Sequence, residues 1–125
     1  MDIVAALFVE NIDFRQVAGP STRIDITGAF FSVKPDTYPT TLSPHLVVLV
    51  REPADGDGNG SLEVIFRRGD EEVGRNVQQF SVEPGRFGYR LVKGELDFDE
   101  PGTVEAYCRI VETESTVVVP LTALP

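Results

Sequence analysis

The sequence predicts an all-β fold: a two-sheet antiparallel β-sandwich of the immunoglobulin-like or C2-like kind, with about eight strands. Apolar and polar residues alternate over short runs, and helical periodicity is nearly absent. Turn residues separate these runs at the spacing typical of sandwiches and barrels. The chain of 125 residues has a common size for one domain and is long enough to bury a core without disulfides or metals. We therefore expect residues 1–125 to form a single domain, with a small β-barrel as the alternative, since barrels produce the same alternation.

The first predicted strand covers residues 3–10, and its apolar residues fall on both faces. Such a strand is covered on both sides of its sheet or pairs with another subunit. The more polar residues 11–20 that follow are expected to form a connection, which ends in the turn dipeptide Gly19-Pro20.

A second strand is predicted over residues 22–33, with Ile24 and Ile26 facing inward. Gly28 interrupts this run, and a glycine inside a strand often marks a bulge or a close backbone approach. The next segment, residues 34–44, contains Pro35, Pro39 and Pro44. Proline cannot donate a hydrogen bond to a ladder, so this segment is expected to be an extended loop without strand pairing.

The most apolar run of the chain, residues 46–50, is expected to organise the fold. It opens a segment, residues 45–75, that is predicted to form a long β-hairpin whose arms are joined by an acidic glycine-rich loop. A second, tighter turn is predicted at residues 68–71.

The C-terminal half is predicted to contribute several further strands. Residues 73–82 form a weaker strand whose apolar residues change face, which a bulge near Gln78 would explain. Residues 87–98 follow, and residues 103–111 and 116–121 close the sheet with clean alternation. The side chains expected to face inward in these last two strands are Val104, Ala106, Cys108, Ile110, Val117, Val119 and Leu121.

The charge balance restricts the class of partner. The chain has 11 basic and 20 acidic residues, and its net charge is −9. Binding to nucleic acid depends on neutralising phosphates with Lys and Arg, so we expect no nucleic-acid partner, and we expect no binding to anionic membranes. The apolar N-terminal run lacks the basic start of a signal peptide, and no run reaches the length of a membrane span. Together with a single cysteine, these features favour a cytoplasmic protein.

The acidic loop contains the only spacing typical of a metal site. Asp55, Asp57 and Asn59, followed by Gly60, match the first half of an EF-hand calcium loop. Phe66 occupies the position of the bidentate glutamate in that motif, and strands flank the loop where an EF-hand has helices. The competing interpretation is an ordinary hairpin loop, because Asp, Asn and Gly suit its backbone conformations. Calcium is the only cofactor that the sequence indicates, with Asp55, Asp57 and Asn59 as its candidate ligands.

No catalytic residue is predicted. His45 is the only histidine and Cys108 the only cysteine, so the usual nucleophile–base pairs lack their components. Cys108 is expected to be a small core residue, and His45 to lie at the rim of the fold. Paired acidic residues are numerous, but they fall in turns, where charged residues are common.

We expect a non-enzymatic protein-interaction or assembly module, whose partner is another protein or a second copy of the chain in a homodimer. The reason is the surplus of apolar residues on both faces of residues 3–9 and 46–50. One alternative is a calcium-dependent ligand-binding sandwich, and a third hypothesis is a small hydrolase that uses carboxylates. The predicted interface residues are Leu46, Val48, Val50 and Tyr107.

Five sequence segments together form a pattern: residues 6–11 (ALFVEN), 25–30 (DITGAF), 46–48 (LVV), 84–87 (PGRF) and 119–121 (VPL). Together they resemble a family of small uncharacterised bacterial β-sandwich proteins. The resemblance covers nearly the whole chain, and it implies the fold without implying an activity or a functional residue.

Overall fold

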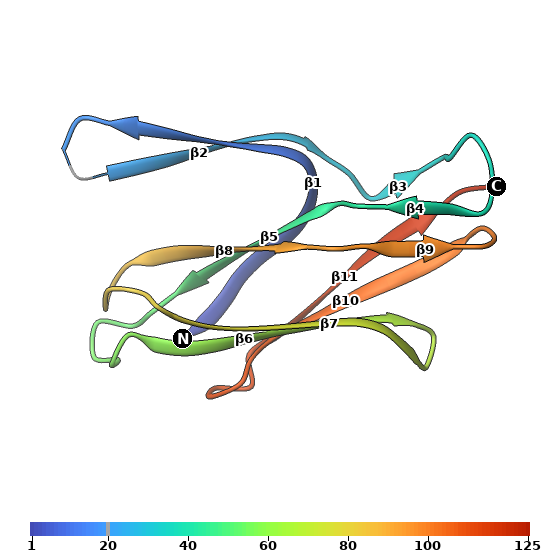
Figure 1. Cartoon of the computed structure of the whole chain (residues 1–125). Helices are drawn as coiled ribbons and strands as arrows, with labels where there is room; N and C mark the ends of the chain where they lie inside the picture. Colours follow the sequence, from blue (N-terminus) through green and yellow to red (C-terminus); the bar gives the residue numbers. More distant parts are fainter. Residues whose placement is uncertain (20) are drawn as a thin grey trace.

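The computed structural model describes residues 1–19 and 21–125, and within them it contains eleven β-strands (Figure 1). Most of these strands lie in two facing sheets. The strands are β1 (Asp2–Val17), β2 (Ser21–Ala29), β3 (Ser32–Val33), β4 (Thr40–Leu42), β5 (His45–Arg51), β6 (Asn59–Arg68), β7 (Glu71–Ser81), β8 (Phe87–Lys93), β9 (Leu96–Phe98), β10 (Gly102–Ile110) and β11 (Thr116–Ala123).

Sheet A has the strand order β2-β1-β5-β8, and sheet B has the order β3-β11-β10-β6-β7. Strands β4 and β9 form a short ladder of their own. All pairings are antiparallel except that between β3 and β11. No sheet closes on itself in the part of the chain that the structure describes, so the β-sandwich prediction is confirmed and the alternative of a small barrel is wrong. These residues also contain no helix with the length and apolar character of a membrane span.

The core lies between the two sheets and takes side chains from both. Burial of this apolar surface is the main stabilising contribution to the fold. The inward-facing residues predicted for residues 103–111 are confirmed, since Val104, Ala106 and Ile110 are fully buried. The largest fully buried core side chains are Phe8, Leu46, Val48, Val50, Leu62, Val64, Leu96, Phe98, Ile110 and Leu121.

The predicted hairpin between β5 and β6 is wrong. Strand β5 pairs with β1 and β8 in sheet A, whereas β6 pairs with β10 and β7 in sheet B. The acidic loop between them therefore crosses from one sheet to the other. The tight turn predicted at residues 68–71 is correct, because Arg68 pairs with Glu71 and Gly69 has a φ of 59°.

Strand β1 is much longer than predicted. Its first half pairs with β5 and its second half with β2, and Val9 is opposite both His45 and Ala29. The prediction of a connection over residues 11–20 is thus wrong through Val17, and Pro20 lies outside the described residues. Figure 1 shows that β1 bends between its two halves and that the β1–β2 hairpin lies at the periphery of the molecule.

Gly28 has the close approach that the sequence indicates. It adopts a φ of 69°, and a Cβ at this position would lie 2.6 Å from the Oε2 atom of Glu10. Glu10 follows the point where β1 passes from β5 to β2, so Gly28 lets the hairpin form directly at the bend.

Two smaller predictions also need correction. The proline-rich segment contains a short strand, since Thr40–Leu42 pairs with Leu96–Phe98. The irregularity in β7 lies opposite Phe66 and Arg67 rather than near Gln78. The partner of Thr40–Leu42 is distant in sequence, and local alternation does not identify it.

Candidate interaction surface

Three of the four predicted interface residues lie in the core. Leu46, Val48 and Val50 have an exposed fraction of 0% and pack between the two sheets, so their assignment to an interface is wrong. Both faces of β5 are apolar, and alternation alone does not tell which of them faces the core. The residues of β5 that point outward are Val47 and Leu49.

The outer face of sheet A is also apolar. Leu7, Val47 and Leu91 lie side by side on neighbouring strands. The next row along the same face consists of Ala5, Leu49 and Tyr89. Val47 has an exposed fraction of only 2%, although it is not part of the inter-sheet core. A further layer of the chain must therefore cover this part of the face.

We infer that the β1–β2 hairpin supplies this layer. One face of the hairpin is apolar, because Ile12 is opposite Ile26 and Phe14 is opposite Ile24. The ring of Phe14 lies 6.0 Å from that of Tyr89 on β8, centroid to centroid, which is within the range of aromatic contacts. The apolar face of the hairpin thus turns toward the outer face of sheet A.

This cover is incomplete. Phe14 remains 56% exposed and Ile26 39% exposed, while Val4 at a bulge of β1 is 52% exposed. Phe87, two residues before Tyr89 on the same face of β8, is 69% exposed. We call Val4, Phe14, Ile26, Phe87 and Tyr89 the apolar surface.

A depression of about 360 Å³ adjoins the apolar surface at the edges of β7 and β8. Phe87 and Tyr89 form part of its wall, and the guanidinium group of Arg90 lies 5.4 Å from the centre of the Phe80 ring. The complete lining is Phe80, Ser81, Val82, Glu83, Arg86, Phe87, Gly88, Tyr89 and Arg90. Concave surface beside exposed aromatic residues is typical of binding regions.

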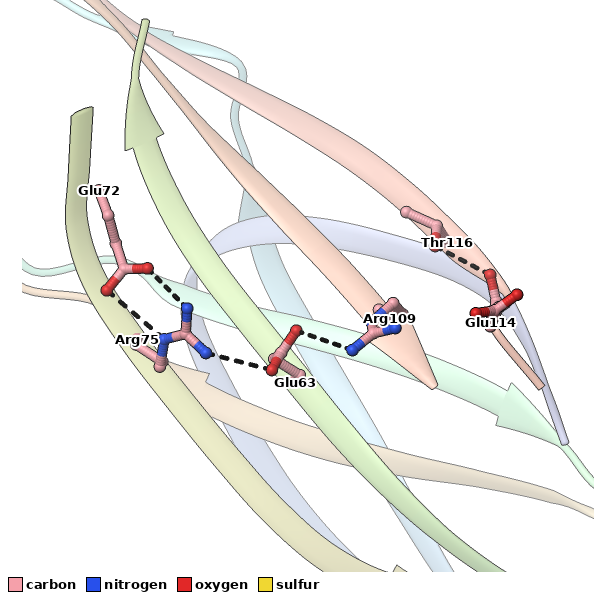
Figure 2. Close-up of polar contacts among 6 residues, drawn as sticks. All are labelled: Glu63, Glu72, Arg75, Arg109, Glu114 and Thr116. Atoms are coloured by element: carbon pink, nitrogen blue, oxygen red, sulfur yellow. Dashed lines mark hydrogen bonds and ion pairs between the residues drawn. The ribbon is translucent and has the colours of Figure 1, made fainter. Parts of the chain in front are cut away.

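Charged side chains pair with one another on the outer face of sheet B, as Figure 2 shows. Arg75 contacts Glu72 at 2.7 Å and Glu63 at 3.2 Å, and Glu63 also contacts Arg109 at 3.4 Å. The hydrogen bond from Arg75 lowers the pKa of Glu72 and raises that of Arg75 itself. We call Glu72, Arg75, Glu63 and Arg109 the charge ladder.

The same end of sheet B, near Arg109, also contains a hydrogen bond from the Thr116 hydroxyl to the main-chain carbonyl of Glu114, at 3.0 Å (Figure 2). Tyr107, the fourth predicted interface residue, lies on this face under the guanidinium group of Arg67, at 5.6 Å. Its outward orientation is confirmed, and its place in an interface stays a prediction.

The acidic loop is organised around Glu52, which is 3% exposed. The Oε2 atom of Glu52 accepts a hydrogen bond from the Gly58 N–H at 2.9 Å, and its Oε1 atom lies 3.3 Å from the α-ammonium group of Met1. Asp57 accepts a hydrogen bond from the Asn59 N–H at 2.9 Å, which is a common loop contact. The closure of the loop therefore depends on Glu52, a residue that the sequence analysis did not single out.

Of the predicted calcium ligands, Asp55 and Asp57 lie in this loop and Asn59 is the first residue of β6; all three are exposed. Across residues 1–19 and 21–125, no group of three or more His, Cys, Asp or Glu residues is arranged to hold a metal ion. The calcium site thus stays a prediction that rests on sequence spacing.

Cys108 and His45 lie where they were expected. Cys108 is fully buried in the core, and burial raises the pKa of its thiol to about 12. His45 is half-buried at the start of β5, between Val9 and Lys93. Neither residue lines the depression at the edges of β7 and β8.

Comparisons with models of known protein families and with curated proteins find no match to this chain. The resemblance to a bacterial family of β-sandwich proteins therefore stays a prediction. The function of the apolar surface has to be inferred from its physical chemistry.

Proposed function

We propose that this protein is a non-enzymatic protein-interaction module that binds a protein partner through the apolar surface. The observation that carries the proposal is the high exposure of two aromatic side chains, Phe14 at 56% and Phe87 at 69%. Tyr89 connects them, since it contacts Phe14 and lies on the same face of β8 as Phe87. A connected group of exposed aromatic residues is typical of the centre of a protein–protein interface.

The energetic reason is the cost of leaving these side chains in water. Full burial of a Phe side chain contributes about 1.5–3 kcal/mol relative to its exposed state. Phe14 and Phe87 would gain more than half of that on binding, and Val4 and Ile26 would add smaller amounts. Such gains offset part of the free energy that association costs in lost translational and rotational freedom.

The calcium-dependent alternative has weaker support from the loop itself. The carboxylate of Glu52 is already bound to Met1 and Gly58, and that of Asp57 accepts a hydrogen bond from Asn59. A metal ion at the predicted ligands would have to compete with the Asn59 N–H for the Oδ1 atom of Asp57.

The experiment compares two double variants as bait in extracts of the cells that produce the protein. Phe14→Ser/Phe87→Ser alters the apolar surface. Val77→Ser/Val118→Ser alters two exposed apolar residues on the outer face of sheet B, 57% and 41% exposed. The tag is placed at the C-terminus, because the α-ammonium group of Met1 is paired with Glu52.

We expect mass spectrometry to find a protein that the unaltered chain and the Val77/Val118 variant both recover, and that the Phe14/Phe87 variant recovers at least about tenfold less, the equivalent of 1.4 kcal/mol. Calorimetry with the purified partner must reproduce this difference. Circular dichroism confirms that both variants are folded. The proposal is wrong if no recovered protein depends on Phe14 and Phe87, or if both double variants lose it equally.

A further inference from the structure

Strand β2 is an edge strand of sheet A, at the periphery of the molecule (Figure 1). The main-chain groups on its outer side have no strand partner in the described chain. An edge of this kind is a template for pairing with another strand. The side chains of β2 therefore decide which strand is accepted.

The charged face of the β1–β2 hairpin has an unfavourable arrangement within one chain. Asp13 lies directly opposite Asp25, and Arg15 lies directly opposite Arg23. Like charges in opposed positions destabilise a strand pair. One diagonal contact relieves this, because Arg15 donates two hydrogen bonds to the carboxylate of Asp25, each at 2.9 Å. Arg23 makes no ion pair with any residue that the structure describes.

We propose that β2 binds β2 of a second copy of this chain, antiparallel, with Ile24 opposite Ile24 of the partner subunit and Arg23 opposite Asp25 of the partner subunit. The inference goes beyond the proposed function, because this contact is made by the edge of β2, whereas the proposed partner binds the apolar surface. The two-fold symmetry of such a pair places each Arg23 beside an Asp25 of the other copy. The acidic pair of one hairpin then lies next to the basic pair of the other, in both rows of the joined sheet.

The same register also brings the apolar side chains of the two hairpins together. Phe14 is opposite Ile24 within each hairpin, so the joined sheet contains a continuous row of two phenylalanines and two isoleucines. This row lengthens the apolar surface across the symmetry axis. The net charge of −9 opposes self-association in general, but this edge carries two acids and two arginines and is locally neutral.

The edges of β7 and β8 are less suited to a second copy. On β7, Arg75 is already bound to Glu72 and Glu63. On β8, the main-chain carbonyl of Leu91 accepts a hydrogen bond from the Gln78 side chain at 2.9 Å, so a residue of β7 already occupies that edge.

The first experiment measures the mass of the full chain by sedimentation equilibrium over a range of concentrations. The unaltered chain should form a dimer. Arg23→Asp places acids opposite acids, Asp25→Arg places arginines opposite arginines, and each variant alone should dimerise at least tenfold more weakly. An equimolar mixture of these two variants restores opposite charges at both positions and should form the dimer again, which misfolded variants would not do.

The second experiment tests the register by disulfide cross-linking under mild oxidation. Ile24→Cys should form a covalent dimer, whereas Thr27→Cys, on the same strand but far from its own copy in this register, should not. The native Cys108 does not interfere, because it is fully buried.

Three outcomes would overturn the inference. The unaltered chain could be a monomer at all concentrations, both single variants could retain the dimer, or Ile24→Cys could fail to cross-link. The proposed function is tested separately, since it stands if a different protein binds through Phe14 and Phe87 while the chain itself is monomeric. The proposed function is wrong if no protein depends on Phe14 and Phe87 for binding, even when a β2 dimer is present.

Discussion

The outer faces of the two sheets differ in how their side chains are paired or covered. On sheet B, Glu63 and Arg75 belong to the charge ladder, whose members pair with one another. On sheet A, the corresponding central residues are Val47 and Leu49. We infer that the β1–β2 hairpin covers them, because Phe14 of the hairpin contacts Tyr89, the neighbour of Leu49 on β8. The charge ladder is paired within the single chain. The apolar face leaves Phe14 and Phe87 exposed, and it is therefore the face on which a partner is expected.

The difference arises from the outward positions of a few strands. In β6 these positions hold Glu63, Ile65 and Arg67, so charged residues flank one isoleucine. In β5 they hold Val47 and Leu49, with no charge between His45 and Arg51. A strand of the first kind can face water, whereas a strand of the second kind requires cover on both sides.

The largest effect is expected from placing a charge under the hairpin. Val47→Asp buries a carboxylate without a partner and should lower the free energy of unfolding by about 3 kcal/mol or more. The matched change on sheet B is Val118→Asp, at a residue 41% exposed, and it should cost no more than about 0.5 kcal/mol. Urea denaturation of both variants measures the contrast. Equal costs would mean that the hairpin does not lie over Val47.

A smaller effect is expected from cutting the charge ladder in the middle. Glu63→Gln removes the partner of both Arg75 and Arg109 and should cost about 1 kcal/mol, less in high salt. Glu83→Gln is the control, because the pair of Glu83 with Arg86 is isolated and highly exposed, and its loss should cost only a few tenths of a kcal/mol. Thermal denaturation at low and high salt tests both values. A Glu63 variant as stable as the Glu83 variant would show that the ladder does not act as a network.

The smallest effect is a pH dependence that belongs to sheet B. The folded-state pKa of Glu72 lies below its ordinary value of 4.5, because Arg75 donates a hydrogen bond to the carboxylate. Its contribution to stability is therefore present above about pH 4.5 and is lost as the pH falls through the lowered pKa. Glu72→Gln should lose less stability than the unaltered protein over this acidic range. NMR titration should show Glu72 returning to its ordinary pKa in Arg75→Gln, and an unchanged midpoint would contradict the assignment.

Alternation was sufficient to predict the sandwich and the buried side chains of β10, because Val104, Ala106, Cys108 and Ile110 alternate with polar residues. It failed for β5, where both faces are apolar and nothing local indicates which face meets sheet B. It also failed for the pairing of β5 with β6, since the acidic loop between them suits a hairpin and a crossing equally well.

The candidate site was missed for a different reason. Ile12 and Phe14 alternate with Asn11, Asp13 and Arg15, which is a strand pattern, but the polar residues and the following Gly19-Pro20 led to the prediction of a connection. The alternation was the signal that identifies this half of β1. The contact between Phe14 and Tyr89 indicates that the resulting hairpin lies over sheet A. These two residues are 75 positions apart in the chain, so no local sequence pattern contains the contact.

The interleaving of the two sheets has a consequence for how the protein is made. In sheet A, β8 pairs with β5, which comes from the first half of the chain. In sheet B, Ser32 of β3 pairs with Thr122 of β11, the last strand. A nascent chain therefore emerges with apolar strands that must wait for partners not yet synthesised. Closing such long loops before any pairing is gained makes folding slow, roughly milliseconds to seconds for sandwiches of this kind. Until then the chain is exposed to aggregation, and an early encounter with a chaperone would protect it.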